Sequence, residues 1–467
     1  MRSAIQKIRN IWAAVDIRKK ILFTALILLI YRFGCALPVP YVSSAMVEGF
    51  KSQYGNTIFS YMNILSGGAL GQATFFALGI SPYITAQIVI QLLTVAFKKL
   101  QEWSKDETGD GKRKIEMLTR ISTIILAVVT SLAYFFIIAN NGWLVKSNTW
   151  VFTMNGTEYS ALQMLFIVSV FTAGASLIMW LGEKINERGI GNGISMILFA
   201  NILASGPSMI GGIYNLFVAD KIYFGIPFGI LAIVVSFLMV YYVVYITNSE
   251  RRIPVQYAKR VVGRKMYGGQ NSNLPIKLNM TGVMPIIFAS SIVSLPATIS
   301  ALFGYANATQ DKNPGWYWLN QIFGQTSIVY VLLFVALIVA FSYFYIVISF
   351  DPVEVSNNLK QNGGSIPGIR PGESTAKYIK KILDRITFLG AIFLAIIAGA
   401  PLLVSCIAAL LNKFEVTTNF FGAEVLYGLQ TLTFGGSSLL IVIGVALETY
   451  RIIEAQMSMR HYKGFLQ

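Results

Sequence analysis

The sequence predicts an all-α membrane protein whose chain crosses the bilayer many times. Of the 467 residues, 55% are hydrophobic and only 12% are charged, whereas about 25% are charged in an ordinary soluble domain. Long apolar stretches recur along the chain at lengths that suit membrane helices. Lys and Arg total 37 against 21 Asp and Glu, so the few charges are mostly positive.

Ten apolar stretches are long enough to span a membrane, since a transmembrane helix needs about 20 mostly apolar residues at a rise of about 1.5 Å per residue. The first follows Arg18-Lys19-Lys20, which is how a signal peptide can begin. Nine further spans follow and no small-residue cleavage site stands out, so we expect a retained first helix. The stretches cover approximately residues 21–37, 74–97, 115–139, 160–181, 192–211, 222–246, 281–303, 327–350, 386–411 and 427–450.

The positions of Lys and Arg predict how these helices are oriented, because positively charged loops remain on the cytoplasmic side. Thirty of the 37 basic residues fall on the face that carries both termini, five fall on the opposite face, and Arg32 and Arg120 lie inside spans. The sequence therefore predicts a cytoplasmic N-terminal arm at 1–20 and a cytoplasmic tail at 451–467. An even number of crossings agrees with this placement.

Ten spans can divide into two halves of five, at residues 21–211 and 222–450. An odd number of spans per half would invert the second half relative to the first, an arrangement that places a functional path between the halves. The two long cytoplasmic loops, 247–280 and 351–385, would both belong to the second half.

The loop at 247–280 is longer than a simple connection needs. Its valines, tyrosines and turn glycines predict a hairpin-like finger. Two explanations account for the excess of basic residues in this loop. The loop either only sets the membrane topology or contacts an acidic or polyanionic partner such as RNA. Besides Lys277, these basic residues are Arg251, Arg252, Lys259, Arg260, Arg264 and Lys265.

The loop at 351–385 presents one arginine between two turns. In Pro367-Gly368-Ile369-Arg370-Pro371-Gly372, a Pro-Gly turn stands on each side of Ile369-Arg370, and a helical run at 374–385 follows. The turns fix the backbone around Arg370, and a guanidinium held in place suits bidentate recognition of carboxylate or phosphate.

Residues 59–74 form a segment that is apolar enough to enter the membrane, yet Gly67-Gly68 interrupts it and another full span follows at once. An extra crossing here would reverse every later loop against the charge distribution, so we predict a short half-inserted helix on the outer side. Non-helical backbone at that depth is tolerated only inside protein or beside a water-filled cavity. The segment is either a loop packed on the outer surface or a plug over a pore, at roughly 59–73, that includes Ile64, Leu65, Ser66, Gly67, Gly68, Ala69 and Leu70.

Helical spacing places several residues on faces that can line a path. Amides in hydrocarbon are unfavourable unless they meet a partner or a cavity, so the polar members of this set face another helix or water. Ordinary packing also uses isoleucine at these spacings, so spacing alone does not define a ring. The residues are Ile80, Ile84, Gln87 and Gln91 in the second span, Ile194 and Leu198 in the fifth, and Ile287, Ser290 and Ser291 in the seventh.

The composition argues against several function classes. One His and two Cys leave almost nothing for a zinc site, a histidine-centred catalytic apparatus or a disulfide framework, so we expect no metal, no cofactor and no enzyme activity. No Walker-type glycine loop occurs, so energy for transport must come from a partner. A ten-span secondary transporter is the alternative, although its ion or substrate site would be expected within the spans, which carry very few charges.

Five long segments match a known family in the order of the chain. Together they resemble SecY, the channel subunit of the Sec protein translocase, and the likeness extends from Arg32-Phe33-Gly34 to the last span. The segments are residues 63–93 with Ser66-Gly67-Gly68-Ala69-Leu70 and Phe76-Ala77-Leu78-Gly79-Ile80-Ser81-Pro82-Tyr83-Ile84, residues 180–195, Arg251-Arg252-Ile253-Pro254-Val255-Gln256-Tyr257-Ala258-Lys259-Arg260, Pro367-Gly368-Ile369-Arg370-Pro371-Gly372-Glu373 and Phe434-Gly435-Gly436-Ser437-Ser438-Leu439-Leu440-Ile441.

The resemblance implies a clamshell of two pseudo-symmetric inverted halves, closed outside by the plug. A lateral gate between spans 2–3 and 7–8 would admit signal sequences and release membrane helices into lipid, and spacing suggests Gln87, Gln91, Ser290 and Ser291 as its polar positions. Position 198 is Leu where Ile is often found, which leaves the constriction apolar. The implied apolar constriction, here called the pore ring, is Ile80, Ile84, Ile194, Leu198, Ile287 and Ile441.

The resemblance also implies partners and a location. The SecA ATPase or a translating ribosome would drive the nascent or preprotein chain, SecE would clamp the two halves, and SecG would accompany them in a bacterial plasma membrane. Lys265 stands where a second Arg is common, so a bidentate contact is not expected there. The basic residues of the finger and Arg370 would contact SecA or ribosomal RNA.

Overall fold

The computed structural model describes residues 9, 11–54, 58–106, 109–145, 151–154, 157–207, 211, 214, 222–257, 260–262, 265–267, 271–303, 305, 313–324, 327–413 and 435–463. Within these residues, ten helices correspond in order to the ten predicted apolar stretches. They are α2 (Val15–Gly34), α5 (Ser81–Ala96), α7 (Asp110–Asn140), α8 (Ala161–Arg188), α9 (Gly193–Ala204), α11 (Ile222–Asn248), α12 (Met284–Leu302), α14 (Ile328–Ser349), α16 (Glu373–Lys413) and α19 (Gly435–Lys463).

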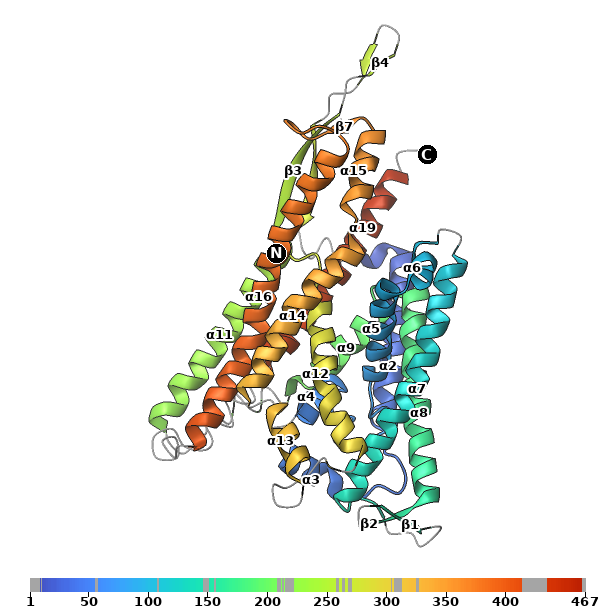
Figure 1. The fold of residues 1–467 in the computed structure, drawn as a ribbon, viewed down its shortest axis with the longest axis vertical. Coiled ribbons are helices and arrows are strands. Elements are labelled where there is room, and N and C mark those ends of the chain that lie inside the picture. The colour runs from blue at the N-terminus through green and yellow to red at the C-terminus, as the bar shows by residue number, and fades with distance from the viewer. Residues whose placement is uncertain are drawn as a thin grey trace.

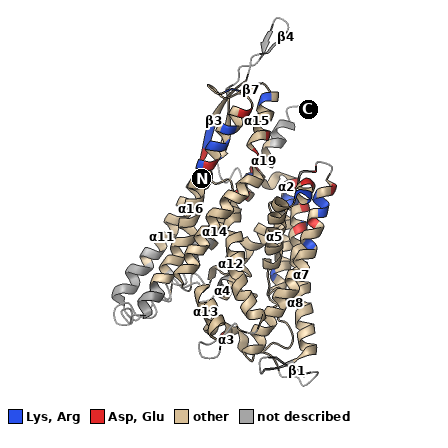
Figure 2. Cartoon of the chain, in the orientation of Figure 1, with Lys and Arg blue, Asp and Glu red and all other residues tan. Residues whose placement is uncertain are grey.

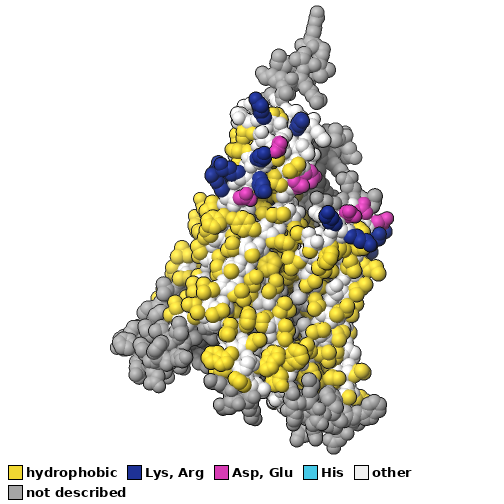
Figure 3. Space-filling view, viewed as in Figure 1, with side chains coloured by type: hydrophobic (Ala, Val, Ile, Leu, Met, Phe, Trp, Pro, Cys, Tyr) yellow, Lys and Arg dark blue, Asp and Glu magenta, His cyan; other side chains and the backbone are white. Residues whose placement is uncertain are grey.

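Membrane-spanning length and apolarity vary among these helices. Five of the described ones, α7, α8, α12, α14 and α16, are each long and apolar enough to cross a membrane. The helix α5 reaches that length only together with α6 (Lys98–Lys105), and the chain bends by 110° between the two. Hydrophobic side chains cover the middle of the molecule, and charged ones lie toward one end (Figure 3). The predicted all-α, polytopic membrane class is confirmed.

The prediction of helix from residue 74 onward in the second stretch was wrong. Residues 66–80 form a series of turns, and the helix begins only at Ser81. Gly67, Gly68 and Gly79 all have positive φ, a conformation that ends a regular helix and that glycine adopts at little steric cost. Of the last predicted stretch, residues 427–434 lie outside the described residues.

The helices of the two halves lie on opposite sides of the molecule (Figure 1). On one side α2, α5, α7 and α8 pack together, and on the other α14 packs with α16 while α11 packs with α19. The two sides meet where α12 contacts α5 and α7 and where α19 contacts α9. One continuous apolar core runs through all of them.

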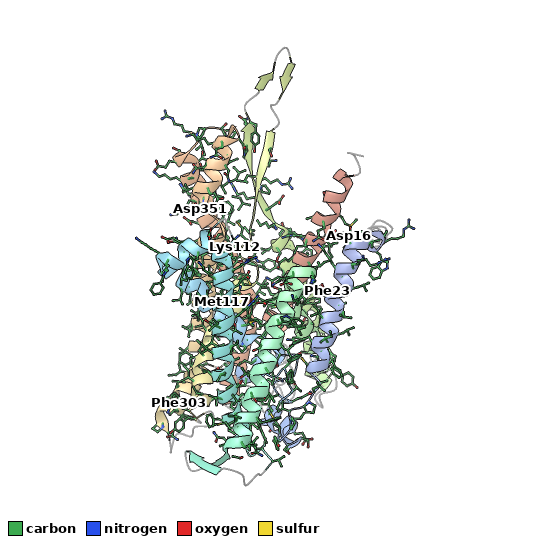
Figure 4. The ribbon with its side chains drawn as sticks, turned by 90° about the vertical axis from the view of Figure 1, so that its right-hand side faces the viewer. Asp16, Phe23, Lys112, Met117, Phe303 and Asp351 are labelled. Atoms are coloured by element: carbon green, nitrogen blue, oxygen red, sulfur yellow. The ribbon has the colours of Figure 1, made fainter. Side chains whose placement is uncertain are left out.

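Short elements gather at the end away from the charged loops. They are α3 (Ala45–Tyr54), α13 (Pro314–Ile322) and the hairpin of β1 (Val151–Met154) and β2 (Thr157–Ser160). The helix α4 (Ile58–Leu65) lies deeper, where it contacts α9. Figure 4 shows the polarity of the molecule, with Asp16, Lys112 and Asp351 toward the charged end and Phe303 toward the other.

The predicted finger is a long antiparallel hairpin. Strands β3 (Glu250–Tyr257) and β6 (Asn271–Lys277) pair from Glu250 opposite Lys277 to Gln256 opposite Asn271, and β4 (Arg260–Val262) pairs with β5 (Lys265–Tyr267) at the tip. The second loop joins the same sheet, because β7 (Gly364–Ser365) pairs with the end of β3. The two loops therefore form one platform, in which Ile253 and Ile366 pack with Ile379 of α16.

Candidate pore and docking surfaces

Five of the six pore-ring residues line a single cavity. Ile80 and Ile84 come from the start of α5, and Leu198, Ile287 and Ile441 come from α9, α12 and α19. All five side chains are at least nine-tenths buried. The cavity measures about 30 Å³, which is room for about two water molecules. Ile194, one turn before Leu198, is buried in the same apolar core but not on this cavity.

The predicted plug segment, residues 59–73, borders the same cavity. Leu65, Ser66 and Leu70 line it together with the ring residues. The helix α4 ends at Leu65 and the chain then turns at Gly67 and Gly68, whose φ values are 68° and 88°. Within the turn the Ser66 hydroxyl donates to the carbonyl of Asn63 at 3.0 Å and accepts from the Leu70 amide at 3.1 Å.

Side chains that sequence reasoning gave no role hold this segment in place. Asn201 of α9 donates to the Leu65 carbonyl at 2.7 Å and to the Tyr31 hydroxyl at 2.8 Å, and Arg32 of α2 donates to the Gly67 carbonyl at 3.1 Å. The Tyr134 hydroxyl donates to the Leu70 carbonyl. An asparagine inside an otherwise apolar span was the sequence signal that could have identified Asn201.

A larger cavity, lined by both polar and apolar residues, lies on the side of the finger. It measures about 410 Å³ and is lined by Asn192, Ser195, Lys277, Glu448 and Arg451, among others. The Arg451 guanidinium donates at 2.8 Å to both the Thr247 carbonyl and the Asn248 side chain, which ties α19 to the end of α11. Partial burial and the nearby Arg451 charge lower the pKa of Lys277 from its ordinary value.

The four polar positions assigned to a lateral gate do not form one cluster. Ser290 and Ser291 line the small cavity, and their hydroxyls donate to the Ile287 carbonyl of their own helix at 2.8 and 3.0 Å. Gln87 and Gln91 are half-buried on α5 and do not line it. The helices themselves are adjacent, because α12 packs against both α5 and α7.

The Lys and Arg side chains that Figure 2 draws gather at one end of the molecule, which includes β3. Arg251 and Arg252 are exposed on β3, where Arg252 pairs with Glu250 at 2.7 Å. Arg260 lies in β4 and Lys265 in β5 at the tip of the finger. Lys259 and Arg264 lie outside the described residues.

Arg370 is exposed at the top of a closely fixed turn. Gly368 and Gly372 on either side have φ values of 79° and 103°. The Thr375 hydroxyl donates to the Arg370 carbonyl at 2.9 Å, and the Ser356 hydroxyl donates to the Gly372 carbonyl at 2.7 Å. The backbone around the guanidinium is thus held from both sides while the side chain remains accessible. Among the described residues, no group of three or more His, Cys, Asp or Glu side chains is placed to hold a metal ion.

Comparison with known proteins identifies the family. The sequence profile of the SecY family matches residues 74–450. Protein translocase subunit SecY of Halalkalibacterium halodurans is 39% identical over 464 residues, which cover 98% of this chain and 99% of that protein. The SecY subunit of Streptomyces coelicolor is 41% identical over 457 residues, with 97% of each chain covered.

Solved structures share the fold. One described as a protein-conducting channel superimposes with a TM-score of 0.62 at 17% identity, covering 94% of this chain and 92% of that one. Sec61 in the canine ribosome-channel complex gives a TM-score of 0.58 at 16% identity, with the same coverage. The family resemblance expected from the sequence motifs is confirmed, and the chain belongs to the SecY family.

Proposed function

We propose that this chain is the channel subunit of a bacterial protein translocase, which passes secretory polypeptides across the plasma membrane and releases membrane-protein helices sideways into lipid. The observation that carries the proposal is the convergence of aliphatic side chains from both halves on a cavity of about 30 Å³, beside a cavity of about 410 Å³ whose lining includes charged side chains. A path that narrows to an apolar waist suits a polypeptide of varied side chains better than it suits a solute held at a fixed polar site.

The pore ring acts as a flexible seal in this proposal. Aliphatic side chains yield to a passing chain and fit around it without hydrogen bonding to it. When no chain is present, a constriction this narrow and apolar excludes water and ions. The plug segment at 59–73 covers the ring, and the contact of Leu65, Ser66 and Leu70 with the ring cavity supports that role.

The seam between α5 and α7 on one side and α12 and α14 on the other serves as the lateral gate. A hydrophobic signal sequence entering this seam would have lipid on one side and the pore on the other, so it can partition between them. Gln87, Gln91, Ser290 and Ser291 are the polar positions it would meet. The direct packing of α12 on α5 and α7 supports this assignment.

The driving force comes from a partner that docks on the cytoplasmic platform. The sequence holds no Walker-type nucleotide loop, and the platform carries exposed arginines at Arg251, Arg252 and Arg370. Guanidinium groups bind the carboxylates of a protein surface or the phosphates of RNA. SecA and the ribosome, with its ribosomal RNA, are the two motors that these contacts fit, and SecE and SecG complete the channel.

The orientation of the chain follows from its charge. Both termini lie in the cytoplasm in this proposal, because the basic loops remain on that side. The first half at 21–211 and the second at 222–450 then form the two inverted halves of the clamshell. The arrangement of α2, α5, α7 and α8 opposite α14 and α16 supports this division.

Purification of the complex from bacterial membranes in mild detergent tests the proposal. SecE should copurify, and vesicles containing the complex should take up a preprotein only when SecA and ATP are supplied. A chain that purifies without SecE and accumulates a small solute under an ion gradient would instead be a secondary transporter. In that event the proposed function is wrong.

A further inference from the structure

The carbonyl end of α4 is buried between helices of the first half. A helix leaves its last four carbonyls without partners inside the helix. The turn that follows satisfies three of them, because the amides of Ser66, Gly67 and Gly68 donate to Met62, Ile64 and Asn63 respectively. The Leu65 carbonyl is left for a side chain, and the Gly67 carbonyl points out of the turn.

Two donors from separate helices take these two carbonyls. Asn201 has no exposed surface, and its amide group divides its two N–H donors between the Leu65 carbonyl and the Tyr31 hydroxyl. Arg32 is half-buried within α2 and donates to the Gly67 carbonyl. A positive charge at the C-terminal end of a helix also interacts favourably with the helix dipole.

On the side of the second half, the hydroxyls of Ser290 and Ser291 that reach the cavity donate to the Ile287 carbonyl of their own helix. There the plug faces Ile287 and Ile441 of the second half across the small cavity. The side-chain hydrogen bonds from Arg32, Tyr134 and Asn201 to the plug come from α2, α7 and α9, all in the first half. Displacing the plug would leave Asn201 and Arg32 without these carbonyls in an apolar interior, where an unpaired polar group is unfavourable.

We propose that Arg32 and Asn201 form a two-donor latch on the plug and that this latch determines how hydrophobic a signal sequence must be to open the channel. The inference rests on the proposed function of the plug. A signal sequence can shift the equilibrium from the closed to the open channel only by as much free energy as it gains from binding the open state in preference to the closed state. Loss of a latch hydrogen bond lowers the free energy needed to open the channel, so a less hydrophobic signal sequence is then sufficient.

Gly67 provides a steric test of the latch, and Gly68 provides its matched control. A Cβ on Gly67 would lie 2.6 Å from Nη1 of Arg32 and 2.9 Å from Oδ1 of Asn201, whereas a Cβ on Gly68 meets nothing within 4 Å. Both glycines have positive φ, so Gly67→Ala and Gly68→Ala share the same kind of backbone strain. The difference between the two variants isolates the latch.

The experiment measures export of a preprotein whose signal sequence is shortened in its hydrophobic region, in vesicles that contain the complete complex. Arg32→Met, Asn201→Leu and Gly67→Ala should each raise export of this defective substrate on the order of tenfold, as expected for loss of one hydrogen bond to a charged or buried donor. Gly68→Ala should raise it less. Arg32→Lys, which retains the charge and can still donate a hydrogen bond, should fall between Arg32→Met and wild type.

Further variants keep the result interpretable. Asn201→Ala removes both donors without adding a charge, so it replaces Asn201→Leu if that variant fails to accumulate in the membrane. Wild-type discrimination in both the Arg32 and Asn201 variants, at normal abundance, would overturn the latch. Equal effects of Gly67→Ala and Gly68→Ala would assign the change to backbone strain and overturn it too.

A ring variant separates failure of the latch from failure of the pore. Ile84→Asn is assayed with the same defective substrate. If Ile84→Asn relaxes discrimination and the latch variants do not, the latch alone is wrong. If no variant relaxes it, the proposed roles of the ring and the plug are wrong as well.

Discussion

Replacing Ile84 by Asn should make the resting channel leak ions. The Ile84 side chain is 4% exposed and lines the small cavity with other aliphatic groups. The nearest hydroxyls on that cavity from α12, those of Ser290 and Ser291, already donate to the Ile287 carbonyl. An amide placed there without a full set of partners disfavours the closed, dry state by about 1–3 kcal/mol.

This free energy predicts a measurable change in the resting channel. A shift of about 2 kcal/mol changes a two-state equilibrium about 30-fold. The cavity has room for only about two water molecules at its volume of about 30 Å³, so a single water recruited by the amide would fill a large part of it. The wetted fraction, and with it the resting ion conductance of vesicles containing the complex, should rise by about that factor.

Two matched variants separate polarity from packing. Ile84→Leu keeps the volume and the apolar character, and should leave the resting conductance close to that of wild type. Ile88→Asn makes the same change one turn further along α5 at a side chain that is 2% exposed but does not line the cavity. It should lower the amount of folded protein without raising conductance per channel.

The result that refutes this reasoning is a resting conductance of Ile84→Asn equal to that of wild type at equal protein abundance. A leak in Ile88→Asn as large as that in Ile84→Asn would also refute it, because the leak would then reflect general loosening of the helix. Conductance measured in planar bilayers across several voltages provides the comparison.

Two further predictions concern the platform and the helix packing. Arg370→Glu should reduce SecA-driven export at least tenfold while the protein stays abundant in the membrane. Arg370 is exposed, and its guanidinium makes none of the hydrogen bonds described above, so the substitution should not destabilise the fold. Normal export by this variant would show that Arg370 does not contact the motor. Gly193→Ala should lower stability by about 1–3 kcal/mol, because its Cβ would lie 2.0 Å from the Gly182 carbonyl, whereas Gly315→Ala meets nothing within 4 Å. Thermal unfolding in detergent compares the two, and equal midpoints would contradict the packing argument.

The helical architecture could be predicted because it depends on local composition. An apolar stretch such as 327–350 can only be a helix in a membrane, where every backbone amide must find a partner within its own segment, and α14 occupies it almost completely. The finger at 247–280 was equally local, because alternating residues and turn glycines fix a hairpin. Pairing of β7 with β3 was not predictable, since it joins two loops that are separated in the chain by the membrane helices α12 and α14.

In the candidate site, too, the features that depend on residues near in sequence were predictable, and those that depend on distant residues were not. Ile80 and Ile84 share a helix face by their spacing, but their meeting with Ile441 depends on how two halves of the chain pack. Gln91 was predicted as a gate residue from the same spacing, although it does not line the cavity. Asn201 was overlooked because its partners, Tyr31 and the Leu65 carbonyl, lie 170 and 136 residues away in sequence.

The arrangement of contacts links the gate to the ring mechanically. The two halves touch where α12 meets α5 and α7, and where α19 meets α9. The cavity-lining members of the ring lie on, or at the start of, these same helices: α5, α9, α12 and α19. Any separation of α12 from α5 that admits a signal helix must therefore also move Ile287 away from Ile84 and widen the ring. In the proposed closed state, Asn201, Arg32 and Tyr134 of the first half donate hydrogen bonds to the plug, so we expect that widening the ring does not by itself release the plug and that opening requires both events.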